Sequence, residues 1–144
     1  MKIITVILLT IFLGKGCGDA NKLALENTII EYTANTRGYY YQITIQNQMV
    51  SVSKDRNGTE SPVVTKLSDS DWSEIITDFK AINLEEIPKL EAPTKYRHHD
   101  GAAMANLKIT NQEKVYQSQT FDNGYPPEKI AKLVNKVNSF AKRE

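Results

Sequence analysis

The sequence has few of the side chains from which most catalytic and metal sites are built. Its 144 residues include a single cysteine, Cys17, and only two histidines, which are adjacent at His98 and His99. Structural zinc sites need four cysteine, histidine or carboxylate ligands, and covalent catalysis needs a nucleophile beside a base. We therefore expect neither a metal site nor a cofactor.

An excess of charge of either sign is also missing. The chain carries 18 basic and 17 acidic residues, a formal net charge of +1, and without residues 1–16, which hold two lysines and no acid, the charge becomes −1. Such a balance predicts no nucleic-acid partner. With 40% hydrophobic and 24% charged residues, the mature chain is expected to form one globular domain. It is not expected to be collagen-like, disordered or a polytopic membrane protein.

Residues 1–16 have the pattern of a secretory signal. Lys2 precedes an apolar run of eleven residues, Ile3 to Leu13, which is broken only by two threonines and is followed by glycines around Lys15. A helix of that length spans about 17 Å, too short for a hydrocarbon core of roughly 30 Å. We therefore interpret residues 1–16 as a signal peptide for export and not as a membrane-spanning helix.

The only cysteine follows this signal directly. An unpaired thiol in an oxidising compartment is a liability unless it is modified. The segment from Leu13 to Cys17 resembles the lipobox of bacterial lipoproteins, with the leucine four positions before the cysteine instead of three. The resemblance implies that Cys17 carries fatty acids such as palmitate and anchors the protein to a membrane of the cell envelope. Residues 17–26 would be the lipidated cysteine and its tether, and residues 27–144 the single folded domain.

Alternating polar and apolar residues predict strands in both halves of this domain. The clearest alternation runs over eight residues, from Tyr39 to Gln46, and resumes from Met49 to Lys54 after a turn at 47–48. Asp55 to Gly58 has the composition of a hairpin turn. Further strands are expected around residues 30–34, 63–64 and 107–109, and, after a turn at 111–112, over 115–121.

Two amphipathic helices are predicted, one after each group of strands. The first begins at Ser68 as N-cap, and the second begins at Pro126–Pro127, where proline is tolerated. Each carries five apolar residues at the same spacing, 72, 75, 76, 79 and 82 in the first and 130, 133, 134, 137 and 140 in the second. We therefore predict an α+β domain made of two related hairpin-helix units, in which an antiparallel sheet of about six strands carries both helices on one face.

The densest polar cluster lies between the two halves, from Pro93 to Gly101, and it contains Tyr96, Arg97, His98, His99 and Asp100. Adjacent histidines in an extended segment point to opposite sides, so they do not easily share a metal ion. His98 and Asp100 could serve as base and orienting acid, but no nucleophile accompanies them. The segment is either an exposed loop that turns at Asp100 or a contact surface for a partner, because tyrosine and arginine supply large contacts.

Three further features of the sequence are candidates for binding sites. Strand parity sends Tyr39 and Tyr41 inward and leaves Tyr40 outside, so only Tyr40 needs a reason beyond packing. In the segment from Phe121 to Pro127, Phe121 and Tyr125 are expected to pack the start of the second helix onto the core. Polar residues on the other face of the sheet form either a solvated surface or a docking platform for a peptide, glycan or protein. They are Gln42, Thr44, Gln46, Ser51, Ser53 and Lys108, together with Gln117 and Gln119.

The lipobox and the segments from Pro93 to Ala102 and from Phe121 to Pro127 resemble small lipoproteins of Bacteroidetes-type bacteria, a group that implies no particular activity. The layout of hairpins with a proline-led final helix is also similar to emfourin-like inhibitors of thermolysin-type proteases. The leading hypothesis is a non-enzymatic, lipid-anchored module that binds an envelope protein or another envelope ligand. Its candidate contact surfaces are the loop from Tyr96 to Asp100 and the polar face of the sheet, together with Tyr40. The alternatives are a protease inhibitor, a small hydrolytic enzyme that uses His98, His99 and Asp100, and a purely structural envelope component.

Overall fold

The computed structural model describes residues 25–142, which form seven strands, two α-helices and four short 3₁₀ helices. The strands are β1 (Thr28–Thr36), β2 (Tyr39–Gln46), β3 (Met49–Ser53), β4 (Val63–Lys66), β5 (Met104–Asn111), β6 (Lys114–Gln117) and β7 (Phe121–Asp122). The α-helices are α2 (Asp69–Lys80) and α3 (Ala131–Ser139), and the 3₁₀ helices are η1 (Leu84–Lys89), η2 (Tyr96–His99), η3 (Glu128–Ile130) and η4 (Phe140–Lys142). The predicted signal peptide, the lipidation at Cys17 and most of the tether lie outside the described residues.

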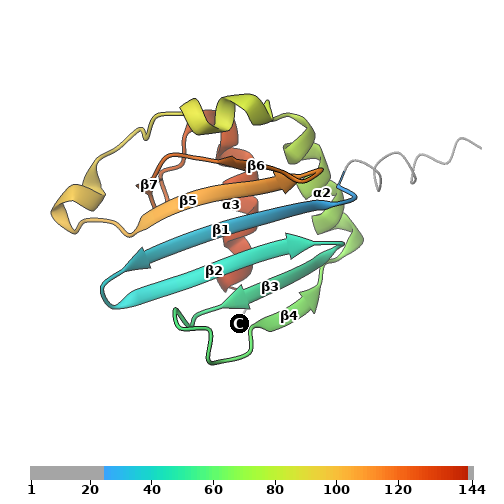
Figure 1. Ribbon diagram of the computed structural model, residues 1–144, viewed down its shortest axis with the longest axis horizontal. Coiled ribbons are helices and arrows are strands. Elements are labelled where there is room, and N and C mark those ends of the chain that lie inside the picture. The colour runs from blue at the N-terminus through green and yellow to red at the C-terminus, as the bar shows by residue number, and fades with distance from the viewer. Residues whose placement is uncertain (1–24, 143–144) are drawn as a thin grey trace, which may run out of the picture.

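All the strands belong to one sheet, in the order β4-β3-β2-β1-β5-β6, with β7 paired to the start of β5. Every pair is antiparallel, and β1 lies in the centre between β2 and β5. In Figure 1 the sheet faces the viewer and α3 crosses behind it, beside α2. The predicted α+β class and a sheet of about six antiparallel strands are therefore confirmed.

Burial alternates along the central strands as the sequence pattern requires. In β1, for example, Ile30, Tyr32 and Ala34 are buried while the residues between them are only half-buried. The register places Tyr32 between Ile43 of β2 and Leu107 of β5, so one face of the sheet is a continuous apolar layer. That layer and the helices enclose a single core.

The two helices cover this layer with the stripes predicted for them. Ser68 caps α2, since its side-chain oxygen accepts a hydrogen bond from the backbone N–H of Asp71 at 3.1 Å. The three central residues of the α2 stripe are buried, whereas Trp72 and Ile82 at its ends are only partly buried. All five residues of the second stripe, from Ile130 to Phe140, are buried.

Turn geometry agrees with the prediction in one hairpin and differs in two. Asn47 and Gln48 have φ angles of 52° and 62°, which suit a two-residue hairpin turn. The corresponding turn after β5 lies at Gln112–Glu113, one residue later than expected. The expected tight hairpin at Asp55 to Gly58 is instead part of a longer connection, residues 54–62, that is organised around the Asp55 carboxylate.

The strand expected over residues 115–121 is split into β6 and β7. Ser118 lies at the break, where its hydroxyl accepts a hydrogen bond from the backbone N–H of Leu107 and its own N–H donates to the Leu107 carbonyl. This local exchange ends the regular ladder, and the chain rejoins β5 only at Phe121, which pairs with Ala105. Four strands precede α2 and three precede α3, so the structure does not confirm two related hairpin-helix units.

The folded domain begins earlier than the sequence predicts. Leu25, which was expected in the tether, is only 2% exposed and belongs to the core, and its carbonyl accepts a hydrogen bond from the N–H of Thr28.

Within residues 25–142, none of the helices has the length and apolar character needed to span a bilayer.

Candidate functional site

Four connections gather at one end of the sheet, which we call the loop end: residues 36–39, 54–62, 93–103 and 123–127. The strand directions produce this arrangement, because β1 and β3 finish there while β2, β4 and β5 begin there. Leu25 and the start of β1 lie at the opposite end, so the loop end is the part of the domain farthest along β1 from the expected tether (Figure 1).

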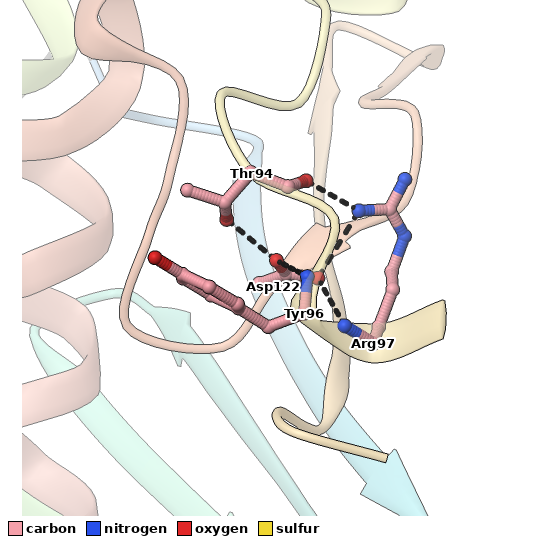
Figure 2. Close-up of polar contacts among 4 residues, drawn as sticks. All are labelled: Thr94, Tyr96, Arg97 and Asp122. Atoms are coloured by element: carbon pink, nitrogen blue, oxygen red, sulfur yellow. Dashed lines mark hydrogen bonds and ion pairs between the residues drawn. The ribbon is translucent and has the colours of Figure 1, made fainter. Parts of the chain in front are cut away.

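The loop that carries the predicted site is fixed by one buried carboxylate, Asp122. Figure 2 shows this group surrounded by donors from the segment Thr94 to Arg97. It accepts hydrogen bonds from the Thr94 hydroxyl (2.5 Å) and from the backbone N–H groups of Tyr96 (2.7 Å) and Arg97 (3.0 Å). The Arg97 guanidinium adds an ion pair at 3.1 Å and also donates to the Thr94 carbonyl at 2.8 Å. The charge of Arg97 is thus used to hold the loop in place.

The electrostatics of this cluster favour the ionised carboxylate. Burial of Asp122, which is 0% exposed, by itself raises its pKa, but the hydrogen bonds from Thr94, Arg97 and Tyr96 outweigh burial and lower the pKa to about 2. The carboxylate is therefore charged at neutral pH, and its four donors make it an anchor for the loop and not a proton-transfer group.

Beyond the anchor, the loop turns sharply at Asp100 and Gly101. Asp100 has a φ of 56°, and the N–H of Gly101 donates to the carbonyl of Tyr96 at 2.9 Å. A Cβ atom at position 101 would lie 3.2 Å from that carbonyl oxygen, so the close approach favours glycine. The predicted turn at Asp100–Gly101 is confirmed, and it closes the 3₁₀ helix η2, which the sequence did not predict.

This anchored loop exposes an aromatic pair. The rings of Tyr96 and Tyr125 meet edge to face, with centroids 5.1 Å apart, and the two residues remain 50% and 48% exposed. Tyr125 therefore does not pack onto the core as expected, although Phe121, four residues earlier, is fully buried. The pair lies at the loop end because β7 brings residue 125 beside the anchored segment.

A second group of aromatic and basic side chains lies across the loop end. Tyr39 is 49% exposed, so the prediction that it points into the core is wrong: it shares the inner face with Tyr41, but it stands beyond the covered part of that face. Tyr40 lies on the outer face as predicted and is half-buried. The Arg56 guanidinium lies 5.8 Å from the Tyr40 ring centroid and donates to the carbonyl of Thr36, which ties the connection 54–62 to the first hairpin.

The histidines and Asp100 are on the surface. All three residues are exposed, and within the described part of the chain neither histidine ring bonds to Asp100. No group of three metal-binding side chains comes together among residues 25–142. The structure thus brings Tyr96 and Arg97 together with Asp122, but it leaves His98, His99 and Asp100 as an outward-facing edge of the loop.

The outer face of the sheet has the polar character that the alternation predicted. Gln42 pairs with Ser53, Thr44 with Ser51, and Lys108 with Gln117, all on the side away from the core. One ion pair, between Lys108 and Glu31 at 2.7 Å, lies near its centre. Gln119 is an exception, because it follows β6 and donates to the carbonyl of Pro88 within η1.

A network of tyrosine hydroxyls and asparagine amides supports the loop end from within, and sequence reasoning missed it. The Tyr32 hydroxyl donates to Asn123 Oδ1 at 2.6 Å, and the Tyr41 hydroxyl donates to Asn138 Oδ1 and lies 3.1 Å from Asn123 Oδ1. Burial and the neighbouring Tyr39 raise the pKa of Tyr41 to about 12. These residues are 82 to 97 positions apart in sequence, and the residues around Asn123 predict only a turn.

The sequence matches no protein-family model, and no curated protein matches it at a significant level. The function is therefore inferred from the geometry of the described residues.

Proposed function

We propose that this protein is a non-enzymatic binding module, anchored by a lipid on Cys17 in the envelope of a bacterium, that engages an envelope ligand through its loop end. The observation that carries the proposal is the collection of half-exposed aromatic residues at one end of the sheet, Tyr39, Tyr96 and Tyr125, held by buried polar anchors. Rigid tyrosines with polar support are typical of binding surfaces, because they offer large contact areas at little entropic cost.

The direction of β1 supports this assignment. The strand has nine residues and so spans about 30 Å between the two ends of the sheet. A tether that ends near Leu25 would hold the opposite end of the domain toward the bilayer and the loop end away from it. The aromatic surface would then face ligands in the aqueous part of the envelope.

The same geometry favours binding over hydrolysis. A catalytic base needs an orienting partner and a pocket that excludes water. His98 and His99 are exposed and make no hydrogen bond to Asp100. The buried carboxylate nearby, Asp122, instead accepts hydrogen bonds from Thr94, Tyr96 and Arg97, which hold the loop in place.

The anchor is tested by feeding cells an alkyne analogue of palmitate and measuring label on the immunoprecipitated protein. We expect label on the wild type and none on Cys17→Ser. Mass spectrometry that finds Cys17 unmodified, or the leader still attached, would contradict the anchor.

The binding end is tested by site-specific photo-crosslinking in living cells. A photoreactive amino acid is placed at Tyr96, at Tyr125 and, as a control, at Val115, which is similarly exposed at 54% but lies on β6. We expect a discrete adduct from positions 96 and 125 and none from 115. Equal yields at all three positions, or adducts from 115 alone, would contradict a ligand at the loop end.

A further inference from the structure

One of the two edges of the sheet is exposed. The edge strands are β4 and β6, and η1 borders β6, where Lys114 forms an ion pair with Glu85 and Gln119 donates to the carbonyl of Pro88. Within residues 25–142, β4 packs chiefly on β3, and all four of its residues are exposed (Figure 1). An exposed edge strand is a template on which another extended chain can pair.

The backbone of β4 carries hydrogen-bonding groups that point away from the sheet. The N–H of Leu67, which follows β4, donates toward β3, to the carbonyl of Gln48 at 2.8 Å. Backbone groups alternate sides along a strand, so Thr65 also faces β3, whereas Val64 and Lys66 direct their N–H and C=O groups to solvent. An extended peptide backbone presents matching groups at the same two-residue spacing.

A cavity of about 410 Å³ opens beside β4 on the inner side of the sheet, with mainly apolar walls from β3, β4 and η4. Val63 and Thr65 line it from β4, because they pair with the core-facing Val52 and Val50. Cavities that bind ligands begin at about 300 Å³, so this one has room for a large side chain. A strand added to β4 would direct alternate side chains to this same face, and one of them would enter the cavity.

The strand that fits this edge needs a large apolar residue over the cavity, which β4 itself does not supply. If two copies paired through β4, each strand would place only Val63 or Thr65 over the cavity of the other. Neither side chain is large enough to fill it. The next inward residue, Leu67, is 4% exposed and already belongs to its own core. The edge therefore fits a strand of different sequence better than a second copy.

Two residues of the edge define the partner further. Lys66 is exposed and pairs with Met49 on the outer face, and its ammonium makes no ion pair or hydrogen bond with another described residue. An acidic residue opposite Lys66 would form a favourable cross-strand pair. Pro62 precedes β4 and has no N–H, so the free edge ends there and an added strand would pair over about five residues.

We propose that the edge of β4 binds a short extended segment of another protein as an added antiparallel strand, with a large apolar side chain in the cavity and an acidic side chain opposite Lys66. The backbone groups of Val64 and Lys66 would supply the hydrogen bonds, and the cavity would supply the specificity. This surface is separate from the aromatic residues of the loop end, none of which lines the cavity, and it does not depend on the lipid anchor.

The test uses ligand-observed NMR titrations of the full chain purified in detergent, with the acetylated and amidated peptide Thr-Glu-Phe-Thr-Val as probe. In the proposed register its phenylalanine lies opposite Thr65 and its glutamate opposite Lys66. A peptide with alanine in place of phenylalanine should bind at least about tenfold more weakly, since burial of a phenylalanine side chain contributes that much. Equal binding of the alanine peptide would overturn the cavity assignment, and absence of binding by the phenylalanine peptide would overturn the proposal.

Methylation of the peptide backbone checks that the peptide binds as a strand. A methyl group on the nitrogen of the second threonine, opposite Val64, removes a donor that would face β4, so we expect affinity to fall about tenfold. A methyl group on the phenylalanine nitrogen removes a donor that would face solvent and should have little effect. Equal losses from the two methyl groups would overturn strand addition.

Variants of the protein locate the site. Val64→Pro removes an N–H that points to solvent, a change that an edge strand tolerates, and should weaken binding about tenfold, whereas Val64→Thr keeps the N–H and should retain binding. Val115→Pro makes the same change on the other edge strand, at a residue that is 54% exposed against 55% for Val64, and should leave affinity unchanged. Circular dichroism identifies any variant that misfolds. Equal losses in Val64→Pro and Val115→Pro would overturn the location.

Sedimentation equilibrium of the chain without peptide examines the other possible occupant of this edge. We expect the wild type and Val64→Pro to have the same oligomeric state. A wild-type dimer that Val64→Pro converts to a monomer would overturn the peptide assignment in favour of a second copy.

Discussion

Replacement of Asp122 by asparagine is the most direct probe of how the loop end is held. The amide has the shape of the carboxylate, but it has no charge, and one of its two ends becomes a donor. That end would face the donors that now bind Asp122, namely the Thr94 hydroxyl and the backbone N–H groups of Tyr96 and Arg97. The Arg97 guanidinium would lose its ion pair.

The cost can be worked out from the pKa. The carboxyl titrates at about 2 in the folded protein against 3.8 for the free side chain, and each pKa unit corresponds to about 1.4 kcal/mol. The ionised group therefore contributes about 2 to 3 kcal/mol to the free energy of unfolding at neutral pH. Hydrogen bonds to charged groups contribute about 1.5 to 3 kcal/mol, which agrees. We expect Asp122→Asn to be about 2 to 3 kcal/mol less stable than the wild type at pH 7.

The pH dependence identifies the cause. Because the pKa in the folded state is depressed, the stabilisation is fully present above pH 4 and is lost as the pH falls through the folded pKa of about 2. The assay is urea denaturation between pH 7 and pH 2, followed by the fluorescence of Trp72, the only tryptophan. The wild type and Asp122→Asn should differ at pH 7 and converge toward pH 2.

Asp100→Asn is the matched control. It removes the same charge from the exposed end of the same loop, and surface changes of this kind stay within about 0.5 kcal/mol. A difference between Asp122→Asn and the wild type that stays constant down to pH 2 would refute the electrostatic account, because a neutral misfit would then explain the whole effect.

Three further variants test the packing that positions the site. Ser68→Ala removes the N-cap of α2 and should cost about 1 kcal/mol in urea denaturation, whereas Ser68→Asp should cost little. Leu107→Ala empties a fully buried position on β5 and should cost about 2 to 5 kcal/mol, with a loss below 1 kcal/mol indicating that the core is not packed there as described. Tyr32→Phe deletes the hydroxyl that donates to Asn123 and should cost about 1 kcal/mol by thermal unfolding, and no loss would show that this bond contributes nothing net.

Sequence alone predicted the features that depend on local periodicity. The alternation in β1 to β3 and the spacing of the two helix stripes follow from burial on one side of each element. These three strands, the two helices and the faces they turn to the core were therefore predicted correctly, except at Tyr39. The Asn47–Gln48 turn has its own local signal as well. The strand over 115–121 failed because Ser118, a small polar residue with no obvious marker, exchanges hydrogen bonds with Leu107 and ends the ladder.

The candidate site was harder to predict because its parts come from distant segments. Asp122 precedes an Asn-Gly pair and has the local pattern of a turn residue, but its partners lie 25 to 28 residues earlier, in Thr94 to Arg97. Asn138 had no distinguishing signal on an amphipathic helix. Tyr39 was placed inward by parity alone, which specifies the face of a strand but not whether another element covers its end.

The central position of β1 has a consequence for the order in which the domain assembles. As the first strand of the domain, it can form a local hairpin with β2 at once, through the turn between Thr36 and Tyr39. The other edge of β1 pairs with β5, which lies much later in the sequence: Asn35 pairs with Met104, so this pairing can form only after the intervening residues have been brought into place. Contacts that close such long loops slow folding, so we expect the second half of the sheet to join in the rate-limiting step. Until then the chain would present an unpaired edge of its central strand, which is when it would be most prone to pair with another chain.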